Sequence, residues 1–484
     1  RARRGGGAAP SCRGLGRASI PAAAHLASKS APGRTDAGIA RRRPLASSLR
    51  ISQRGMSHTT PIIYNLFPTL AGPLPLWQAH AERAHEMGFN WLYVNPLHAP
   101  GFSGSLYAIK DYERLNPALA PGEAGASLDR LAPVFRAIRD LGMGVMVDLV
   151  VNHTAKDSPL IAEHPTWFRR DANGQVVSPS VIDPADTEKV TVWGDLAEVD
   201  NAGSPDRDAL WRHWEGLVLR LLEVGCTGFR CDAAYKVPAP LWRRLVDTAE
   251  ARRPEVVFVA ETLGCRLEEI EALGEAGFGY LYNSSKWWDF VEPWCLEQHE
   301  QVRGLAPSIA FPESHDTPRL AAETGGSEAV QRQRYAFAVA FSAGVQITVG
   351  YEFGFRRQLH VVETRPEDWE APLFDLRAFI RGVNDLKRRH PLLAGEGVLR
   401  LHSTRAPDVT VIERWSDERG THRGLIVVNR NGSAPREVTL AGAAQPQGAR
   451  LFRPCVDGAT PTILPGAGRV RLAPAEVALI MEAL

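Results

Sequence analysis

The chain has 484 residues, of which 44% are hydrophobic and 23% are charged. This composition is typical of a soluble globular protein, and the length allows a large domain with a smaller partner. Residues 1–55 hold twelve Lys and Arg but one acid, and the remainder holds 44 basic and 54 acidic residues. The acidic body argues against a nucleic-acid partner or an anionic membrane surface. No apolar run is long enough to span a bilayer.

Residues 1–55 are rich in Arg, Ala, Gly and Ser and have no lasting apolar period. Such a segment buries too little surface to offset its ordering entropy, which predicts disorder. It is interpreted either as an organelle transit peptide or, as we favour, as an extension upstream of a true start at Met56. We expect it to be dispensable. The six cysteines are scattered without metal-ligand spacing, which favours reduced thiols and a cytoplasmic protein.

From residue 62 to about residue 393, short apolar runs alternate with amphipathic, helix-like segments such as 128–142 and 210–225. This alternation predicts parallel strands with crossover helices, and eight strand-like runs suit a closed (β/α)8 TIM barrel. The alternative is an open doubly wound sheet, but no Gly-rich phosphate turn follows the first strand. The predicted strands are 62–67, 90–96, 145–151, 228–233, 256–261, 280–285, 308–314 and 345–352.

Two segments depart from this alternation. The polar stretch 154–207 follows the third strand and is too long for a loop, which predicts a small inserted subdomain at the mouth of the barrel. From about residue 394, alternating runs separated by Gly, Asn and Pro turns predict a C-terminal antiparallel β-sandwich. We therefore divide the chain into a catalytic barrel, 56–393, that contains the inserted subdomain, and a sandwich, 394–484.

Polar residues stand at the carboxyl ends of the predicted strands, where barrels of this kind place their function. Any one of them alone is more simply explained as a satisfied polar group at a strand end. Three carboxylates crowded at one rim repel each other, however, which costs stability unless a function retains them. The strand ends give Asn152, His153, Arg230, Asp232, Glu261, His315 and Asp316.

Paired carboxylates flanking a bond are what glycoside hydrolysis requires. Arg230 and Asp232 are two apart on a strand and share a face, so the cation would keep the carboxylate ionised, as a nucleophile needs. Glu261 follows the apolar run VVFVA, and partial burial would raise its pKa toward that of a general acid. Asp316 and the two histidines remain to bind sugar hydroxyls.

Four motifs resemble, in order, the signature blocks of the α-amylase superfamily, glycoside hydrolase family 13. They are DLVVNH (148–153), GFRCDAA (228–234), AET (260–262) and ESHDTPR (313–319). The resemblance covers residues from about 60 to 484. It implies that Asp232 is the nucleophile, Glu261 the acid/base and Asp316 the transition-state stabiliser. It also implies sugar contacts for Tyr107, His153, Arg230 and His315.

The same resemblance suggests calcium as an optional metal. Asn152 matches a calcium ligand of some family members, and Asp195 and Asp200 would join it, because calcium takes clustered oxygen ligands. The chemistry expected of the rim requires no cofactor.

Three segments resemble most the bacterial maltosyltransferase branch of this family, which builds α-1,4-glucan from maltose 1-phosphate. They are HEMGFNWLYVNPLHAPG, LYAIKDYERLNP and HPTWFRRDANGQ. The chain departs from that branch at Ala233, where the branch has Asn, and it keeps the His315–Asp316 pair that the branch lacks. We therefore expect a retaining hydrolase or transglycosylase acting on an α-glucan or maltooligosaccharide. The alternatives are maltosyl transfer from maltose 1-phosphate, an isomerase, and a catalytically silent sugar-binding scaffold.

Overall fold

The computed structural model describes residues 60–484 except 184–185, 441, 444, 466–467 and 484. The prediction that residues 1–55 are dispensable concerns a segment outside these residues. In the part of the chain that is described, no helix combines the length and the apolar character needed to cross a bilayer.

Eight parallel strands close into a barrel in the order of the chain, which confirms the predicted (β/α)8 fold. The strands are short and almost wholly buried, as strands with both faces covered should be. They are β1 (Ile62–Leu66), β2 (Trp91–Val94), β5 (Gly144–Leu149), β10 (Gly228–Cys231), β11 (Val257–Ala260), β12 (Tyr280–Tyr282), β13 (Ser308–Ala310) and β14 (Gly344–Thr348).

All eight strands end one to four residues earlier than the runs predicted from the sequence, and two of them show a local cause. The run 280–285 contains only the three residues of β12, because Asn283 turns its side chain to Ser308 and Ser342 and the chain enters a 3-10 helix at Ser285. The run 308–314 stops at the end of β13, shortly before Pro312, whose nitrogen has no hydrogen to donate to a ladder. The residues that remain become rim loops.

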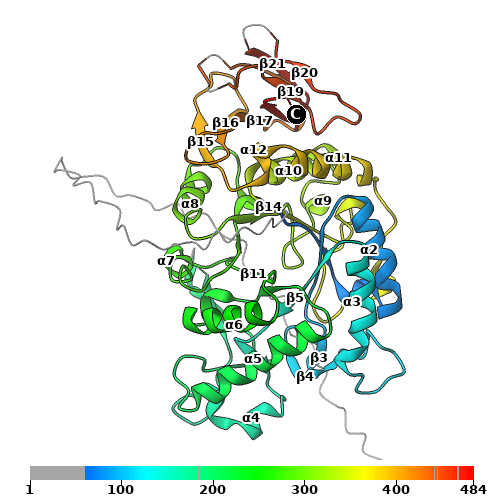
Figure 1. Ribbon diagram of the computed structural model, residues 1–484, viewed down its shortest axis with the longest axis vertical. Helices are drawn as coiled ribbons and strands as arrows, with labels where there is room; N and C mark the ends of the chain where they lie inside the picture. The colour runs from blue at the N-terminus through cyan, green and yellow to red at the C-terminus, as the bar shows by residue number, and fades with distance from the viewer. Residues whose placement is uncertain (1–59, 184–185, 441, 444, 466–467, 484) are drawn as a thin grey trace, which may run out of the picture.

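Amphipathic helices cover the outside of the barrel (Figure 1). In α3, for example, the buried side chains Leu131, Phe135 and Ile138 recur at helical spacing. The longer helices are α2 (Trp77–Glu86), α3 (Leu131–Asp140), α5 (Arg207–Glu223), α6 (Ala239–Arg252), α8 (Trp294–Val302), α10 (Glu328–Phe341) and α11 (Arg377–Arg389). The short ones are α1 (Pro68–Ala71), α4 (Leu160–Glu163), α7 (Leu267–Glu271), α9 (Leu320–Glu323) and α12 (Pro391–Ala394).

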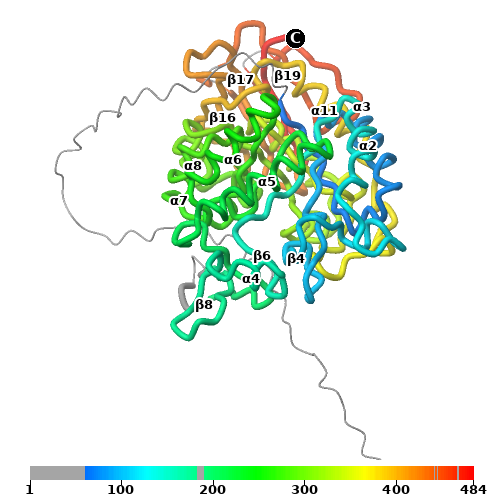
Figure 2. Tube along the Cα trace, turned by 60° about the horizontal axis from the view of Figure 1, so that its bottom comes forward, coloured from blue at the N-terminus to red at the C-terminus, as the bar shows by residue number. Residues whose placement is uncertain are grey.

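The segment after β5 holds small antiparallel pairs instead of one long loop. In Figure 2 the hairpin that contains β8 (Asp186–Val192) and the helix α4 lie away from the barrel, at the end opposite the C-terminal β structure. The elements at this end are β3 (His98–Pro100) paired with β4 (Ile109–Leu115), β6 (His153–Ala155) paired with β9 (Leu196–Glu198), and β7 (Ser180–Asp183) paired with β8 (Asp186–Val192).

The C-terminal part is an antiparallel β structure. Six strands follow the order β15-β16-β17-β22-β19-β20, and β18 pairs separately with β21. Helix α10 contacts the barrel strands β13 and β14 on one side and β17 and β22 on the other, so most of its residues are buried. The strands are β15 (Val398–His402), β16 (Val409–Trp415), β17 (Arg423–Asn429), β18 (Arg436–Thr439), β19 (Arg450–Phe452), β20 (Thr462–Ile463), β21 (Arg469–Leu472) and β22 (Val477–Met481).

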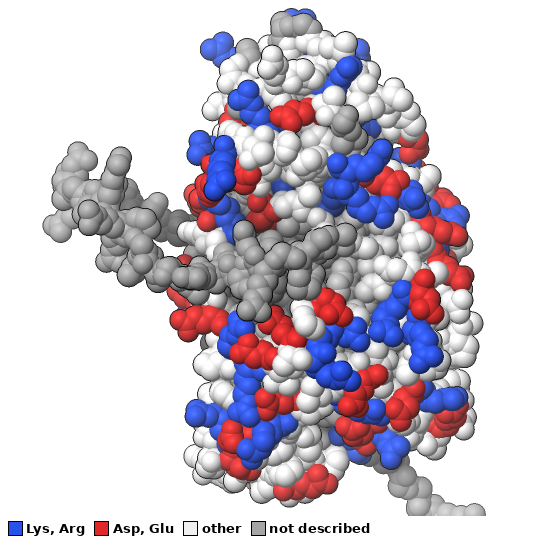
Figure 3. All heavy atoms as spheres, viewed as in Figure 1, with Lys and Arg blue, Asp and Glu red and all other residues white. Residues whose placement is uncertain are grey.

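Charged side chains of both signs are interspersed over the face of the molecule in Figure 3. Several are paired along one helix, such as Arg243 with Asp247 and Arg381 with Asp385. Exposed pairs of this kind contribute about 0–1 kcal/mol each. The stability of the fold therefore depends on its buried contacts.

Two buried basic side chains bond the ends of α10 and α12: Arg414, which lies on β16 of the C-terminal sheet, and Lys387, which lies on α11. Both Lys387 and Arg414 are completely buried, and each donates three hydrogen bonds to main-chain carbonyls near the ends of α10 and α12. The partners of Lys387 are Val339, Ser342 and Leu393, at 2.8–3.0 Å. The partners of Arg414 are Phe341, Leu392 and Gly395, at 2.6–2.9 Å. Carbonyl groups that helix ends leave unpaired are satisfied in this way.

The carboxylate of Glu396 lies beside the amino ends of β13 and β14. It accepts hydrogen bonds from the Ser308 N–H at 3.0 Å, the Ser308 hydroxyl at 2.7 Å and the Ala343 N–H at 2.9 Å. The His299 Nδ1 lies 3.2 Å from the same carboxylate, and the His299 Nε2 lies 2.7 Å from the Gly397 carbonyl.

Glu396→Gln should lower the free energy of unfolding by about 3–5 kcal/mol, because it breaks a buried ion pair and places an amide against two N–H donors. Urea unfolding measures the change. Glu418→Gln is the control, since Glu418 pairs with Arg303 but its side chain is 71% exposed; it should cost about 1 kcal/mol or less. Equal losses in the two variants would contradict the role given to Glu396.

Candidate active site

The end of β10 places Arg230 and Asp232 side by side. The Arg230 Nη1 donates to Asp232 Oδ1 at 2.7 Å and to Asp148 Oδ1 at 2.8 Å. Arg230 is opposite Asp148 in the register of β10 with β5, and only 4% of its side chain is exposed. Charge-assisted hydrogen bonds of this length fix the orientation of both carboxylates.

Asp148 is a site residue to which the sequence analysis assigned no role. Its Oδ2 accepts hydrogen bonds from the hydroxyls of Tyr93, at 2.6 Å, and Tyr107, at 2.7 Å. Burial raises the pKa of Asp148, Arg230 opposes this shift, and Asp232 adds to it. The signal in the sequence was an acid inside the otherwise apolar run VMVDLVV, where a charge needs a buried partner.

Tyr107, His315 and Asp316 form a second chain of contacts at the rim. The Tyr107 hydroxyl lies 2.7 Å from His315 Nε2, and the two rings are stacked with centroids 5.7 Å apart. The same Nε2 lies 2.9 Å from Asp316 Oδ2. Burial alone would raise the pKa of Asp316, but His315 and Arg230 oppose this shift, and the net direction is downward. Asp316 is therefore held as an anion.

Glu261 follows β11 and is held by two main-chain donors. Its Oε2 accepts a hydrogen bond from the Ala233 N–H at 2.8 Å, and its Oε1 accepts one from the Leu263 N–H at 3.1 Å. Burial raises the pKa of Glu261 to about 7; Arg230 opposes the shift, and two neighbouring acids, Asp232 and Asp316, add to it. This is the environment that the sequence analysis expected of a general acid.

A strained turn connects the two carboxylates. Ala233 has a φ of 42° and a ψ of 46°, the left-handed conformation that residues with a Cβ rarely adopt. In this conformation its N–H points to Glu261, while the neighbouring residue Asp232 is held by Arg230. One turn of backbone thus orients the side chains that end two neighbouring strands, and strained positions of this kind are concentrated at functional sites.

His153 is buried next to these groups. Its Nε2 lies 4.0 Å from Asp232 Oδ2 and has no hydrogen-bond partner within the described residues. Burial lowers the pKa of His153, and Asp232 opposes this shift. The structure thus brings together seven residues predicted for catalysis or sugar binding: Tyr107, His153, Arg230, Asp232, Glu261, His315 and Asp316.

Each of the three predicted calcium ligands has a contact within the protein. The Asn152 amide lies 3.4 Å from His153 Nδ1, the Asp195 carbonyl accepts from the Lys156 N–H, and the Asp200 carboxylate accepts from the Gly203 N–H. Across the described part of the chain, no three His, Cys, Asp or Glu side chains are placed to hold a metal. Calcium stays a prediction, and no chemical step is derived from it.

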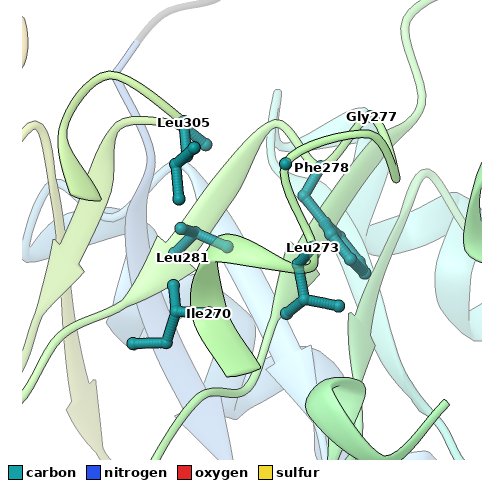
Figure 4. Close-up of a pocket in the computed structure, with 8 residues that line it drawn as sticks. Ile270, Leu273, Gly277, Phe278, Leu281 and Leu305 are labelled. Carbon is teal, nitrogen blue, oxygen red and sulfur yellow. The ribbon is translucent and has the colours of Figure 1, made fainter. Parts of the chain in front are cut away.

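A small apolar pocket of about 30 Å³ lies beside β12, apart from the residues predicted for function (Figure 4). Its lining has no polar side chain that could act on a substrate. The lining residues are Ile270, Leu273, Gly274, Gly277, Phe278, Leu281, Leu305 and Ala306.

Known proteins match both the sequence and this architecture. The family model for the glucanotransferase domain of glycogen debranching enzyme matches residues 58–170. Two relatives are called alpha-1,4-glucan:maltose-1-phosphate maltosyltransferase. The relative from Burkholderia pseudomallei is 29% identical over 83% of this chain, and the relative from Myxococcus xanthus is 26% identical over 82%. The chain spans 36% and 60% of the lengths of these curated relatives.

Solved structures agree with the fold. An alpha-amylase from Lactobacillus plantarum superposes with a TM-score of 0.69 at 23% identity, covering 88% of this chain and 99% of its own. A barrel with three acids at its carboxyl rim is typical of enzymes that act on glycosidic bonds. These matches support the resemblance of this chain to the α-amylase family (glycoside hydrolase family 13), near the maltosyltransferase branch.

The pKa of Glu261 predicts two effects of pH. If Glu261 donates a proton, turnover should fall as the pH rises through about 7. The raised pKa also means that the folded state holds this proton more tightly than the unfolded chain. The resulting stability is fully present below the ordinary glutamate pKa of 4.5 and is lost as the pH rises through about 7.

Glu261→Gln has no such proton to lose. Its melting temperature relative to the parent should therefore rise between about pH 5 and about pH 8. Calorimetry of both proteins measures this difference, with Glu268→Gln, an exposed site on α7, as the control. A difference that stays constant with pH would rule out a raised pKa at Glu261.

Proposed function

We propose that this protein is a retaining enzyme that hydrolyses or transfers α-1,4-linked glucose through a covalent glycosyl-enzyme intermediate. The observation that carries the proposal is the pair Asp232 and Glu261. They follow neighbouring parallel strands, and their environments differ: Asp232 is bonded to a guanidinium, whereas Glu261 is buried with a pKa of about 7. Two carboxyl groups whose environments set them apart are suited to the roles of nucleophile and acid.

In the first step, an oxygen of Asp232 attacks the anomeric carbon. The bond between that carbon and the leaving oxygen breaks, and Glu261 gives its proton to the leaving oxygen. In the second step, Glu261 takes a proton from water or from a sugar hydroxyl, whose oxygen displaces Asp232 from the same carbon. The hydrogen bond from Arg230 keeps Asp232 in one orientation during both steps.

The remaining rim residues bind and stabilise the sugar in this proposal. Asp316, held as an anion beside His315, is positioned to stabilise the positive charge that develops on the sugar ring. The Tyr107 ring supplies a flat apolar surface for the sugar, while its hydroxyl is fixed by Asp148 and His315. The His153 Nε2, which has no partner among the described residues, can bond a hydroxyl group of the substrate.

Maltosyl transfer from maltose 1-phosphate is the second candidate. It is favoured by the names of the relatives that cover most of this chain. In that reaction phosphate leaves the anomeric carbon, and the hydroxyl at the end of an α-1,4-glucan attacks in the second step. An α-glucan or maltooligosaccharide is a substrate in both candidates. A cytoplasmic location stays a prediction.

Product analysis separates the candidates. The protein is incubated with maltooligosaccharides, with and without maltose 1-phosphate, and the products are resolved by chromatography. Shortened or redistributed chains without the phosphate support the first candidate, and chains extended by two glucose units only in its presence support the second. Either reaction should retain the anomeric configuration in a proton NMR time course, because the two carboxyl groups are expected about 5–5.5 Å apart. An inverted product, or binding without turnover, would overturn the proposal.

The roles of the two carboxylates are separable by mutation. Asp232→Asn and Glu261→Gln keep the shapes of the side chains, and each should lower turnover of an α-glucan strongly; acid–base help alone is worth about 10²–10⁴-fold. Fluoride needs little protonation to leave. Glu261→Gln should therefore still release fluoride from an α-glucosyl fluoride in a pre-steady-state burst, and Asp232→Asn should not. Parental activity of Asp232→Asn on any α-glucan would show that the nucleophile is misassigned.

A further inference from the structure

A buried ion pair brackets the loop that carries His315 and Asp316. Glu313 and Arg319 stand at the two ends of this loop, and only 1% of each side chain is exposed. The Arg319 Nη1 donates to Glu313 Oε1 at 2.7 Å, and the Leu320 N–H donates to Glu313 Oε2 at 2.7 Å. The loop is thus closed at its base by two bonds to one carboxylate.

The other nitrogens of Arg319 bind the neighbouring rim loop, which follows β14. Nη2 donates to the Val349 carbonyl at 2.9 Å, and Nε donates to the Arg357 carbonyl at 3.2 Å. One guanidinium therefore connects the loops that leave β13 and β14, and it satisfies main-chain groups that have no strand partner there.

A third rim loop completes a closed ring of contacts. In the loop after β14, the Val361 carbonyl accepts from the Leu106 N–H at 3.1 Å. The next residue is Tyr107, whose hydroxyl lies 2.7 Å from His315 Nε2. The ring therefore runs from the His315–Asp316 loop through Arg319 to the loop after β14, then to the loop of Tyr107, and back to His315.

We propose that Arg319 is a positioning residue that closes this ring and thereby holds Asp316 and His315 at the distance from the sugar that the transition state needs. The inference rests on the proposed function, since it concerns the same site. Arg319 affects the rate of reaction through the loops that it joins and does not touch the substrate.

The geometry favours positioning over simple stabilisation. Taking a guanidinium and a carboxylate out of water is costly, and apolar side chains often replace such pairs without loss of stability. An apolar pair, however, cannot donate to the Val349 and Arg357 carbonyls. Lysine would keep the charge beside Glu313, yet it has a single nitrogen in place of the planar fork that reaches three acceptors.

The test is Arg319→Lys, which keeps the charge but not the ring. We expect kcat to fall about 10–100-fold on whichever substrate the parent turns over, because small displacements of reacting groups cost rates of this order. KM should change less than about 3-fold, since the lost interaction acts mainly in the transition state. A purely structural role would give the parental kcat in all protein that remains folded, as measured by active-site-normalised rates.

A neutral double variant tests the positioning role of Arg319 if Arg319→Lys folds poorly. Glu313→Gln with Arg319→Gln removes both charges, so no buried ion is left unpaired. The control is Glu476→Gln with Arg453→Gln in the C-terminal part, where the Arg453 Nε lies 2.7 Å from Glu476 Oε1 and the carboxylate also accepts from the Ala473 N–H. The Arg453 side chain is 33% exposed, against 1% for Arg319. The rim pair should lose kcat at least 10-fold more than the control pair at equal melting temperature.

Acarbose binding, measured by calorimetry, distinguishes a failure of the proposed function from a failure of the positioning role of Arg319. A parent that neither turns over an α-glucan or maltose 1-phosphate nor binds acarbose contradicts the proposed function. An active parent whose Arg319→Lys and neutral rim variants keep the parental kcat contradicts the positioning role alone. Loss of kcat in the rim variants, with the control variant unchanged, supports it.

Discussion

The site depends on one buried guanidinium. Arg230 lies inside the barrel, opposite Asp148 in the register of β10 with β5, and bonds both Asp148 and Asp232. Its Nη2 is 3.9 Å from Glu261. A single cation thus faces several carboxylates in a space from which water is largely excluded, and it cannot hold all of them ionised. Burial raises the pKa of Glu261 to about 7, Arg230 opposes this shift only in part, and Asp232 and Asp316 add to it, which provides a proton donor near neutral pH.

The barrel fixes the positions of Asp232 and Glu261 relative to each other. In the register of β10 with β11, Cys231 is opposite Ala260, so the residues that follow, Asp232 and Glu261, leave the two strands together. The left-handed turn at Ala233 then donates its N–H to Glu261. Strain at a residue with a Cβ costs about 1–3 kcal/mol, and here it orients the two carboxylates whose roles must differ. The proposed reaction therefore requires that β10 and β11 are parallel and end at residues that lie opposite each other.

Sequence patterns were sufficient for the barrel and for most of the rim. Apolar runs that alternate with helix-like segments predicted the buried parallel strands, and the acids at 232, 261 and 316 follow such runs. The part played by Asp148 was not predictable, because its partner is 82 positions away and only barrel closure brings the two together. The same holds for Arg319, whose acceptors at 349 and 357 are main-chain carbonyls and leave no trace in side-chain identity.

Buried polar side chains at the two ends of the barrel have different partners. At the amino ends of β13 and β14, Glu396 accepts from main-chain N–H groups, and nearby Lys387 and Arg414 donate to main-chain carbonyls. At the carboxyl ends, His153 Nε2 and His315 Nδ1 are buried without a partner among the described residues. An unpaired buried group costs about 1–3 kcal/mol. In the proposed function, these two ring nitrogens provide hydrogen-bonding capacity that a bound sugar can use, and binding the sugar offsets the cost of leaving them unpaired.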